Sequence, residues 1–149
     1  MIMNKIEMTE SIIKAKLEKG LSWNDIASET GLSEIFVTSA CLGQNSLSES
    51  EAVALTTLLD LPSDVATVLT QYPMKGGAIE TVPQDPLIYR FFEIAYVYGG
   101  SLKEVIHEKF GDGIMSAIDF TLDVVKEEDP NGDRVVVTMN GKFLPYKKW

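Results

Sequence analysis

The residues best suited to chemistry lie in the second half of the chain, where Arg90 and Glu93 interrupt a mostly apolar segment from Pro86 to Tyr98. Residues three apart share one face of a helix, so these two charges can pair. A guanidinium taken out of water is costly unless it is well partnered. The pair is therefore either a buried structural ion pair or part of a site that binds anions.

A second candidate is Ser116, which follows the stretch FGDG at residues 110–113. We expect a short helical turn at 114–117, where backbone N–H groups and the Ser116 hydroxyl would face an anion. The alternative is a glycine cap followed by a tight turn. The single histidine, His107, is interpreted as solvated or structurally bonded, and the chain has no Ser-His-Asp order that suggests nucleophilic attack.

Capping residues and glycines predict helices that position these side chains. Five short helices are expected at 9–19, 23–30, 34–42, 49–59 and 63–71, forming a bundle. The Asp85-Pro86 pair begins a further helix that is apolar nearly all round, so we expect it to be buried on every side and to end at Gly99-Gly100. A capping box at Ser101 begins the next helix, which ends at Gly111.

The end of the chain reads as β structure. Strands are expected at 120–125 and 134–139 around a turn at 129–132, and a second turn at Asn140-Gly141 leads into residues 142–146. An isolated hairpin is marginally stable in water, so these strands should pair with more strands or another subunit. The predicted fold class is α+β, mainly α.

The two halves of the chain differ in composition. Residues 72–84 contain two prolines and two adjacent glycines, which indicates a linker. We therefore predict a helical domain at 1–72 and a catalytic and dimerisation domain at 73–149. The first half carries ten acidic and four basic residues, and the second carries twelve and nine.

The stretch from Leu21 to Leu42 resembles the helix-turn-helix of phage-repressor-type DNA-binding domains. A recognition helix needs side chains that read base edges, but the predicted third helix offers an apolar face and Glu34. No Lys or Arg occurs between Lys19 and Lys75. We therefore expect the scaffold without DNA binding, and we interpret Cys41 on the same helix as a buried hydrophobic residue.

Charge and composition exclude several other classes of protein. A net charge of −9 argues against partners held through many phosphates and against anionic membrane surfaces. No apolar run reaches the length of a membrane span, and no signal peptide is recognised at the start. The single cysteine excludes an intrachain disulfide and fits the cytoplasm, and no metal site is expected.

Segments spread over nearly the whole chain resemble the cyanase family. They are residues 36–44 (FVTSACLGQ), 86–93 (PLIYRFFE), 107–120 (HEKFGDGIMSAIDF) and 141–145 (GKFLP). The resemblance implies a helical bundle that is similar to a DNA-binding domain but not used for DNA. It also implies a small dimerisation domain whose strands interlace with a partner, and a homodecamer built from five dimers with active sites shared between subunits.

The resemblance further implies a reaction and its residues. The family decomposes cyanate with bicarbonate to carbamate and carbon dioxide, without a cofactor, and bicarbonate is a co-substrate. Its catalytic arginine, glutamate and serine fall on Arg90, Glu93 and Ser116. The alternatives are a helix-turn-helix transcriptional regulator and an assembly that binds anions without turnover.

Overall fold

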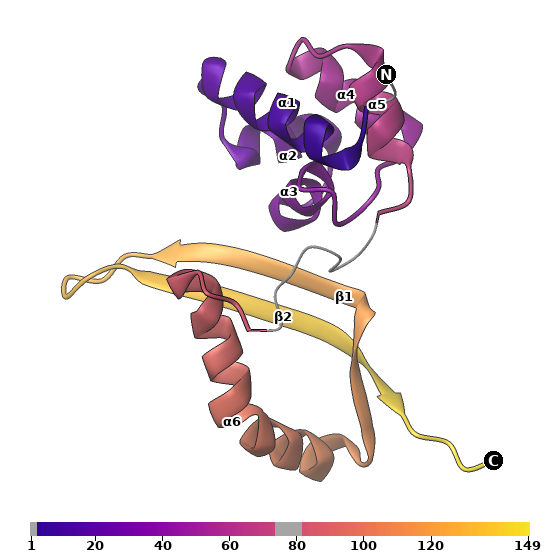
Figure 1. The fold of residues 1–149 in the computed structure, drawn as a ribbon. Coiled ribbons are helices and arrows are strands. Elements are labelled where there is room, and N and C mark those ends of the chain that lie inside the picture. Colours follow the sequence, from indigo (N-terminus) through magenta and orange to yellow (C-terminus); the bar gives the residue numbers. More distant parts are fainter. Residues whose placement is uncertain (1–2, 74–81) are drawn as a thin grey trace. The chain divides into compact units, whose positions relative to one another are not determined.

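The computed structural model describes residues 3–73 and 82–149, and its first part is a bundle of five short helices (Figure 1). The helices are α1 (Lys5–Glu18), α2 (Trp23–Thr30), α3 (Glu34–Cys41), α4 (Glu49–Leu58) and α5 (Ser63–Thr70). All five were predicted. The first begins four residues earlier than expected because Asn4 forms a capping box with Glu7, which supplies a start before Thr9.

The helix-turn-helix element matches its prediction closely. Ser22 caps α2 and accepts a hydrogen bond from the Asp25 backbone N–H, while Gly31 ends the helix at a left-handed φ of 72°. Ser33 then caps α3. The core between the helices consists of 15 buried hydrophobic residues, among them Met8, Ile12, Ile26, Leu55 and Leu69. Cys41 is fully buried in this core, which confirms the packing role predicted for it.

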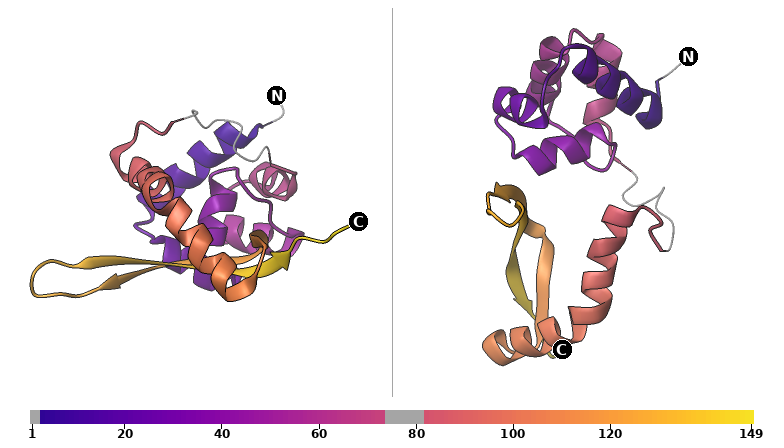
Figure 2. Two further views of the ribbon diagram at one scale, coloured as in Figure 1. Left: turned by 90° about the horizontal axis from the view of Figure 1, so that it is seen from below. Right: turned by 90° about the vertical axis from the view of Figure 1, so that its left-hand side faces the viewer.

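The second part begins with a single long helix, α6 (Pro86–Phe110), capped by the Asp85 side chain. The predicted stop at Gly99-Gly100 is wrong, because neither glycine adopts the positive φ of a helix-ending cap. The two glycines fall near the middle of the residues of α6, and the ribbon of this helix changes direction along its length (Figure 1; Figure 2, right). A glycine pair is a common place for such a bend.

A two-stranded hairpin follows, made of β1 (Gly113–Glu127) and β2 (Arg134–Pro145). The turn predicted at 129–132 is confirmed, with the Asp129 side chain accepting from the Asn131 N–H at 2.8 Å. Two other predictions are wrong. The expected helical turn at 114–117 belongs to β1, and Asn140-Gly141 makes no turn because β2 continues through it.

The described residues group into two compact units. One contains α1–α5 with residues 122–137, and the other contains α6 with residues 113–121 and 138–149. The predicted linker falls largely on residues 74–81, which lie outside the described residues, so the boundary between 72 and 73 stays a prediction. The mainly helical α+β class is confirmed.

The expectation that α6 is buried on every side is wrong for a single chain, since none of its residues is buried. Its large apolar side chains are exposed instead: Leu87, Ile88, Phe91, Phe92, Ile94, Tyr96, Val97, Tyr98, Leu102, Val105 and Phe110. No helix in the described part of the chain is long and apolar enough to cross a membrane.

Candidate active site

The predicted pair of charges forms on α6. The helix begins at Pro86, so Arg90 and Glu93 lie on its second turn and face the same side. Arg90 Nη1 lies 3.2 Å from Glu93 Oε2, and the two side chains are 58% and 45% exposed. The Arg90 guanidinium also lies 5.2 Å from the centre of the Tyr89 ring. The pair thus leaves much of the cation open to an incoming anion.

Ser116 lies near the start of β1 and is one of two buried residues in the part of the segment 82–149 that the structure describes. Its Oγ accepts hydrogen bonds from the backbone N–H groups of Ile118, at 3.1 Å, and Asp119, at 2.9 Å. A hydroxyl oxygen has two lone pairs and one proton. Both lone pairs are occupied here, so the hydroxyl is left to donate a hydrogen bond.

This local geometry corrects the expected role of the backbone. We expected N–H groups near Ser116 to face an anion, but those of Ile118 and Asp119 hold the serine oxygen instead. The sequence contained a usable signal, because a serine three residues before an acidic residue is a common capping pattern. The pattern occurs here inside a strand, where it fixes a side chain.

The three predicted site residues do not form one bonded cluster in the part of the chain that the structure describes. Among residues 3–73 and 82–149, no hydrogen bond or ion pair joins Ser116 to Arg90 or Glu93. One chain therefore offers two part-sites, an accessible cation on α6 and a hydroxyl donor on β1.

Two further residues discussed from the sequence, His107 and Cys41, have surroundings that fit a structural role. His107 Nε2 lies 3.3 Å from the carbonyl oxygen of Gly113 and 3.9 Å from an Asp112 carboxylate oxygen, as expected for a structurally bonded histidine. Burial raises the pKa of the Cys41 thiol to about 12, which leaves it protonated and unreactive at neutral pH.

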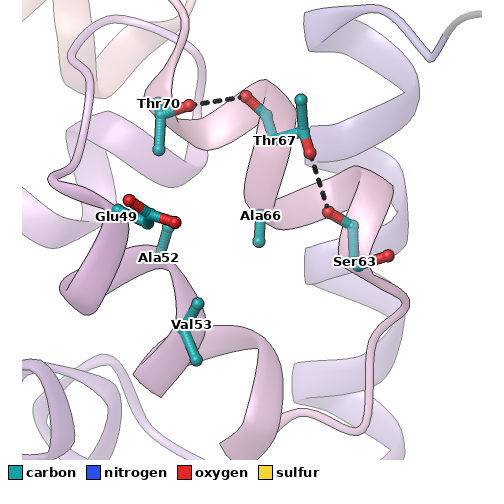
Figure 3. A pocket seen from close by; sticks show the side chains of 7 residues that line it. All are labelled: Glu49, Ala52, Val53, Ser63, Ala66, Thr67 and Thr70. Carbon is teal, nitrogen blue, oxygen red and sulfur yellow. Dashed lines mark hydrogen bonds between the residues drawn. The ribbon is translucent and has the colours of Figure 1, made fainter.

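A pocket on the helical bundle does not suit an anionic ligand (Figure 3). It lies between α4 and α5, and its lining consists of Glu49, Ala52, Val53, Ser63, Ala66, Thr67 and Thr70. Glu49 is the only charged side chain in this lining, and its carboxylate would repel an anion. The pocket contains none of the three predicted site residues.

The fold and the site define a class of protein. It is an α+β chain with a repressor-like helical bundle. A helix and a hairpin follow, and they carry an arginine–glutamate pair and a buried serine. Two family models match it. Residues 5–73 match the model described as "Cyanate hydratase, N-terminal", and residues 80–148 match "Cyanate lyase C-terminal domain".

Individual relatives agree with these models. The chain is 60% identical to the cyanate hydratase of Teredinibacter turnerae over 99% of this chain and all of that protein. It is 57% identical to the cyanate hydratase of a Marinomonas species over the same shares. The crystal structure of cyanase from T. urticae superposes with a TM-score of 0.84 at 43% identity, covering 93% of this chain and 96% of that one. The chain therefore belongs to the cyanate hydratase family.

Proposed function

We propose that the protein catalyses the bicarbonate-dependent decomposition of cyanate. The observation that carries the proposal is the match along nearly the full chain, to both family models and to the whole length of the cyanate hydratase of Teredinibacter turnerae. A helix-turn-helix regulator is not favoured. The helix that would read DNA, α3, has Glu34 as its only charged side chain, and its scaffold belongs to the same family.

In the proposed reaction, a bicarbonate oxygen attacks the carbon of cyanate and the proton of bicarbonate moves to the cyanate nitrogen, which gives a dianionic adduct. The nitrogen takes up one proton from solution as this adduct decomposes. The bond between that oxygen and the bicarbonate carbon then breaks, which releases carbon dioxide and leaves carbamate. Carbamate takes up a second proton and falls apart to ammonia and carbon dioxide without further help. No electrons are transferred, so the proposal includes no redox cofactor, and bicarbonate is a co-substrate.

The charges of the intermediates assign a role to each residue. Both substrates are anions and their adduct is a dianion, so Arg90 supplies the positive charge. Glu93, 3.2 Å from Nη1, orients the guanidinium. Ser116 donates its free hydroxyl proton to a developing oxyanion, as a donor and not as a nucleophile.

We further propose that subunits share each site. One chain of net charge −9 with a single arginine on α6 is a poor trap for two anions. The separated part-sites and the exposed apolar residues of α6 support an assembly that brings Arg90 and Ser116 of different copies together. Our proposal is a homodecamer of five dimers with interlaced strands, located in the cytoplasm.

Ammonia release from cyanate tests the proposal directly. The purified protein should release ammonia when both cyanate and bicarbonate are present, and release should fall toward the uncatalysed rate when bicarbonate is removed. Binding of a dianion such as oxalate without any turnover would instead support an anion-binding assembly. Salt-sensitive, sequence-selective binding to duplex DNA would support the regulator.

A further inference from the structure

Strand β2 approaches Ser116 so closely that only glycine fits opposite it. A Cβ added to Gly141 would overlap the carbonyl oxygen of Ser116 and would lie 2.5 Å from Met115 Cγ and 3.2 Å from Phe120 Cδ2. Gly141 does not have a positive φ, so space and not backbone conformation requires glycine here. The Met115 side chain could rotate away, but the Ser116 carbonyl is main chain and cannot.

Ser116 is thus held from two directions. Its side-chain oxygen is bonded to the N–H groups of Ile118 and Asp119, and its carbonyl faces the bare Cα of Gly141. Ser116 is 6% exposed, and the strand that carries it sets the position of its hydroxyl. A shift of about 1 Å in a catalytic group can cost about 10²-fold in rate.

We propose that Gly141 is a positioning residue for the reaction: by lacking a side chain, it lets β2 hold the Ser116 backbone where the hydroxyl can donate to the oxyanion. The inference rests on the proposed function, because it assumes that Ser116 takes part in that reaction. It explains why the Asn140-Gly141 pair lies within a strand and makes no turn.

The test is a double-mutant cycle on the assembled protein, with kcat and KM for ammonia release measured for the parent, G141A, S116A and the double variant. G141A should lower kcat by at least about tenfold, approaching the loss in S116A of about 10²–10³-fold. If Gly141 acts through Ser116, adding G141A to S116A should lower kcat by less than about threefold further. A purely structural role would give the same loss in both backgrounds.

Gly113 provides a matched control in the same hairpin. A Cβ there would overlap the Leu144 carbonyl oxygen and lie 2.6 Å from Phe143 Cζ, so the crowding is similar but does not fall on Ser116. The loss caused by G113A should be the same with and without S116A. A second check is M115A combined with G141A. M115A removes the overlap of the new Cβ with the Met115 side chain but leaves its overlap with the Ser116 carbonyl, so kcat should not be restored.

Each outcome decides between the alternatives. The inference would be overturned if G141A lowered kcat by the same factor with and without S116A, or if M115A/G141A regained the parent kcat. It would also be overturned if G113A were coupled to S116A as strongly as G141A is. Failure of G141A to assemble under conditions where G113A assembles would also overturn it, because Gly141 would then act on folding. A parent protein without bicarbonate-dependent ammonia release would refute the proposed function itself.

Discussion

The helical bundle and the segment that follows it differ in how far they bury their apolar side chains within one chain. All 15 residues of the hydrophobic core lie between Met8 and Leu69, in the bundle. In the segment of residues 82–149, Gly113 and Ser116 are the only buried residues that the structure describes. The bundle therefore builds a hydrophobic core within one chain, although Ile6, Leu17 and Val53 stay exposed, whereas the helix and hairpin build no such core from the residues that the structure describes.

This difference separates stability from function along the chain. Apolar surface buried within the bundle stabilises that region without a partner. The predicted site residues all lie in the other region, where exposed patches of this extent mark an interaction surface. The region that carries the predicted site residues is thus the one that leaves its apolar side chains exposed, as the proposed sharing of sites between subunits requires.

The largest expected effect is on assembly. The intact protein should have a mass in light scattering far above the 16.5 kDa of one chain, because α6 and the hairpin need partners. A fragment of residues 1–72 should fold as a helical monomer, while residues 82–149 alone should self-associate. An intact protein that stays monomeric at micromolar concentration, or a fragment 1–72 that is unfolded, would break the comparison.

Within the bundle, Leu55 gives the next largest effect. It is fully buried in the core, so Leu55→Ala should lower the free energy of unfolding of fragment 1–72 by about 2–5 kcal/mol through lost burial and a residual cavity. Val53 is on the same helix but is 52% exposed, and Val53→Ala should change it by less than about 0.5 kcal/mol. Urea unfolding measures both. Equal losses would show that the core is not where the structure places it.

In the second region, Arg90→Lys tests the site. Lysine retains the charge but loses the planar fork that bonds paired oxygens. Ammonia release should fall about 10²–10³-fold, the usual cost of losing a donor to an oxyanion. Glu93→Gln should cause a smaller loss because the guanidinium is no longer held. Light scattering must show that both variants assemble, and parent rates in assembled variants would refute this assignment of the site.

The sequence predicted the bundle well because its helix boundaries are set by local chemistry. Ser22 and Gly31 determine both ends of α2, and each acts through its own residue type. In the second region, the same reading found the start of α6 at Asp85 and the hairpin turn, but it misread two other glycine positions. The glycines at 99 and 100 look like a stop, yet helix continues on both sides, and the glycine at 141 looks like a turn but is needed for a close approach between strands.

The candidate site was also predictable only in part. The spacing of Arg90 and Glu93 predicts their pairing, and the structure confirms it. The exposure of these two side chains could not be predicted from the sequence. An apolar helix indicates burial, but it does not indicate whether its own chain or another subunit buries it. The hydrogen bonds to the Ser116 hydroxyl follow a local pattern, but the approach of Gly141 to the Ser116 carbonyl depends on strand register across the hairpin, which no single segment encodes.

The smallest expected effect is acid sensitivity at the start of α2. Hydrogen bonds from the Ser22 hydroxyl and then from the Ser22 backbone N–H lower the pKa of Asp25 below its ordinary value of 3.8. Native Asp25 therefore holds its proton less tightly than unfolded Asp25, and the resulting stability is fully present above pH 3.8 and lost as the pH falls through the lowered native pKa.

In fragment 1–72, Asp25→Asn should destabilise the bundle at pH 7, and its difference from the parent fragment should shrink as the pH falls below about 4, where the unfolded carboxyl gains its proton. Ser28, on the same helix, makes a suitable comparison because Ser28→Ala removes no ionisable group, so its difference from the parent fragment should not change with pH. Thermal unfolding across this pH range measures both. A difference for Asp25→Asn that is constant with pH would mean that the capping box holds Asp25 by shape and not by charge, because a neutral amide would then serve the Ser22 donors equally well.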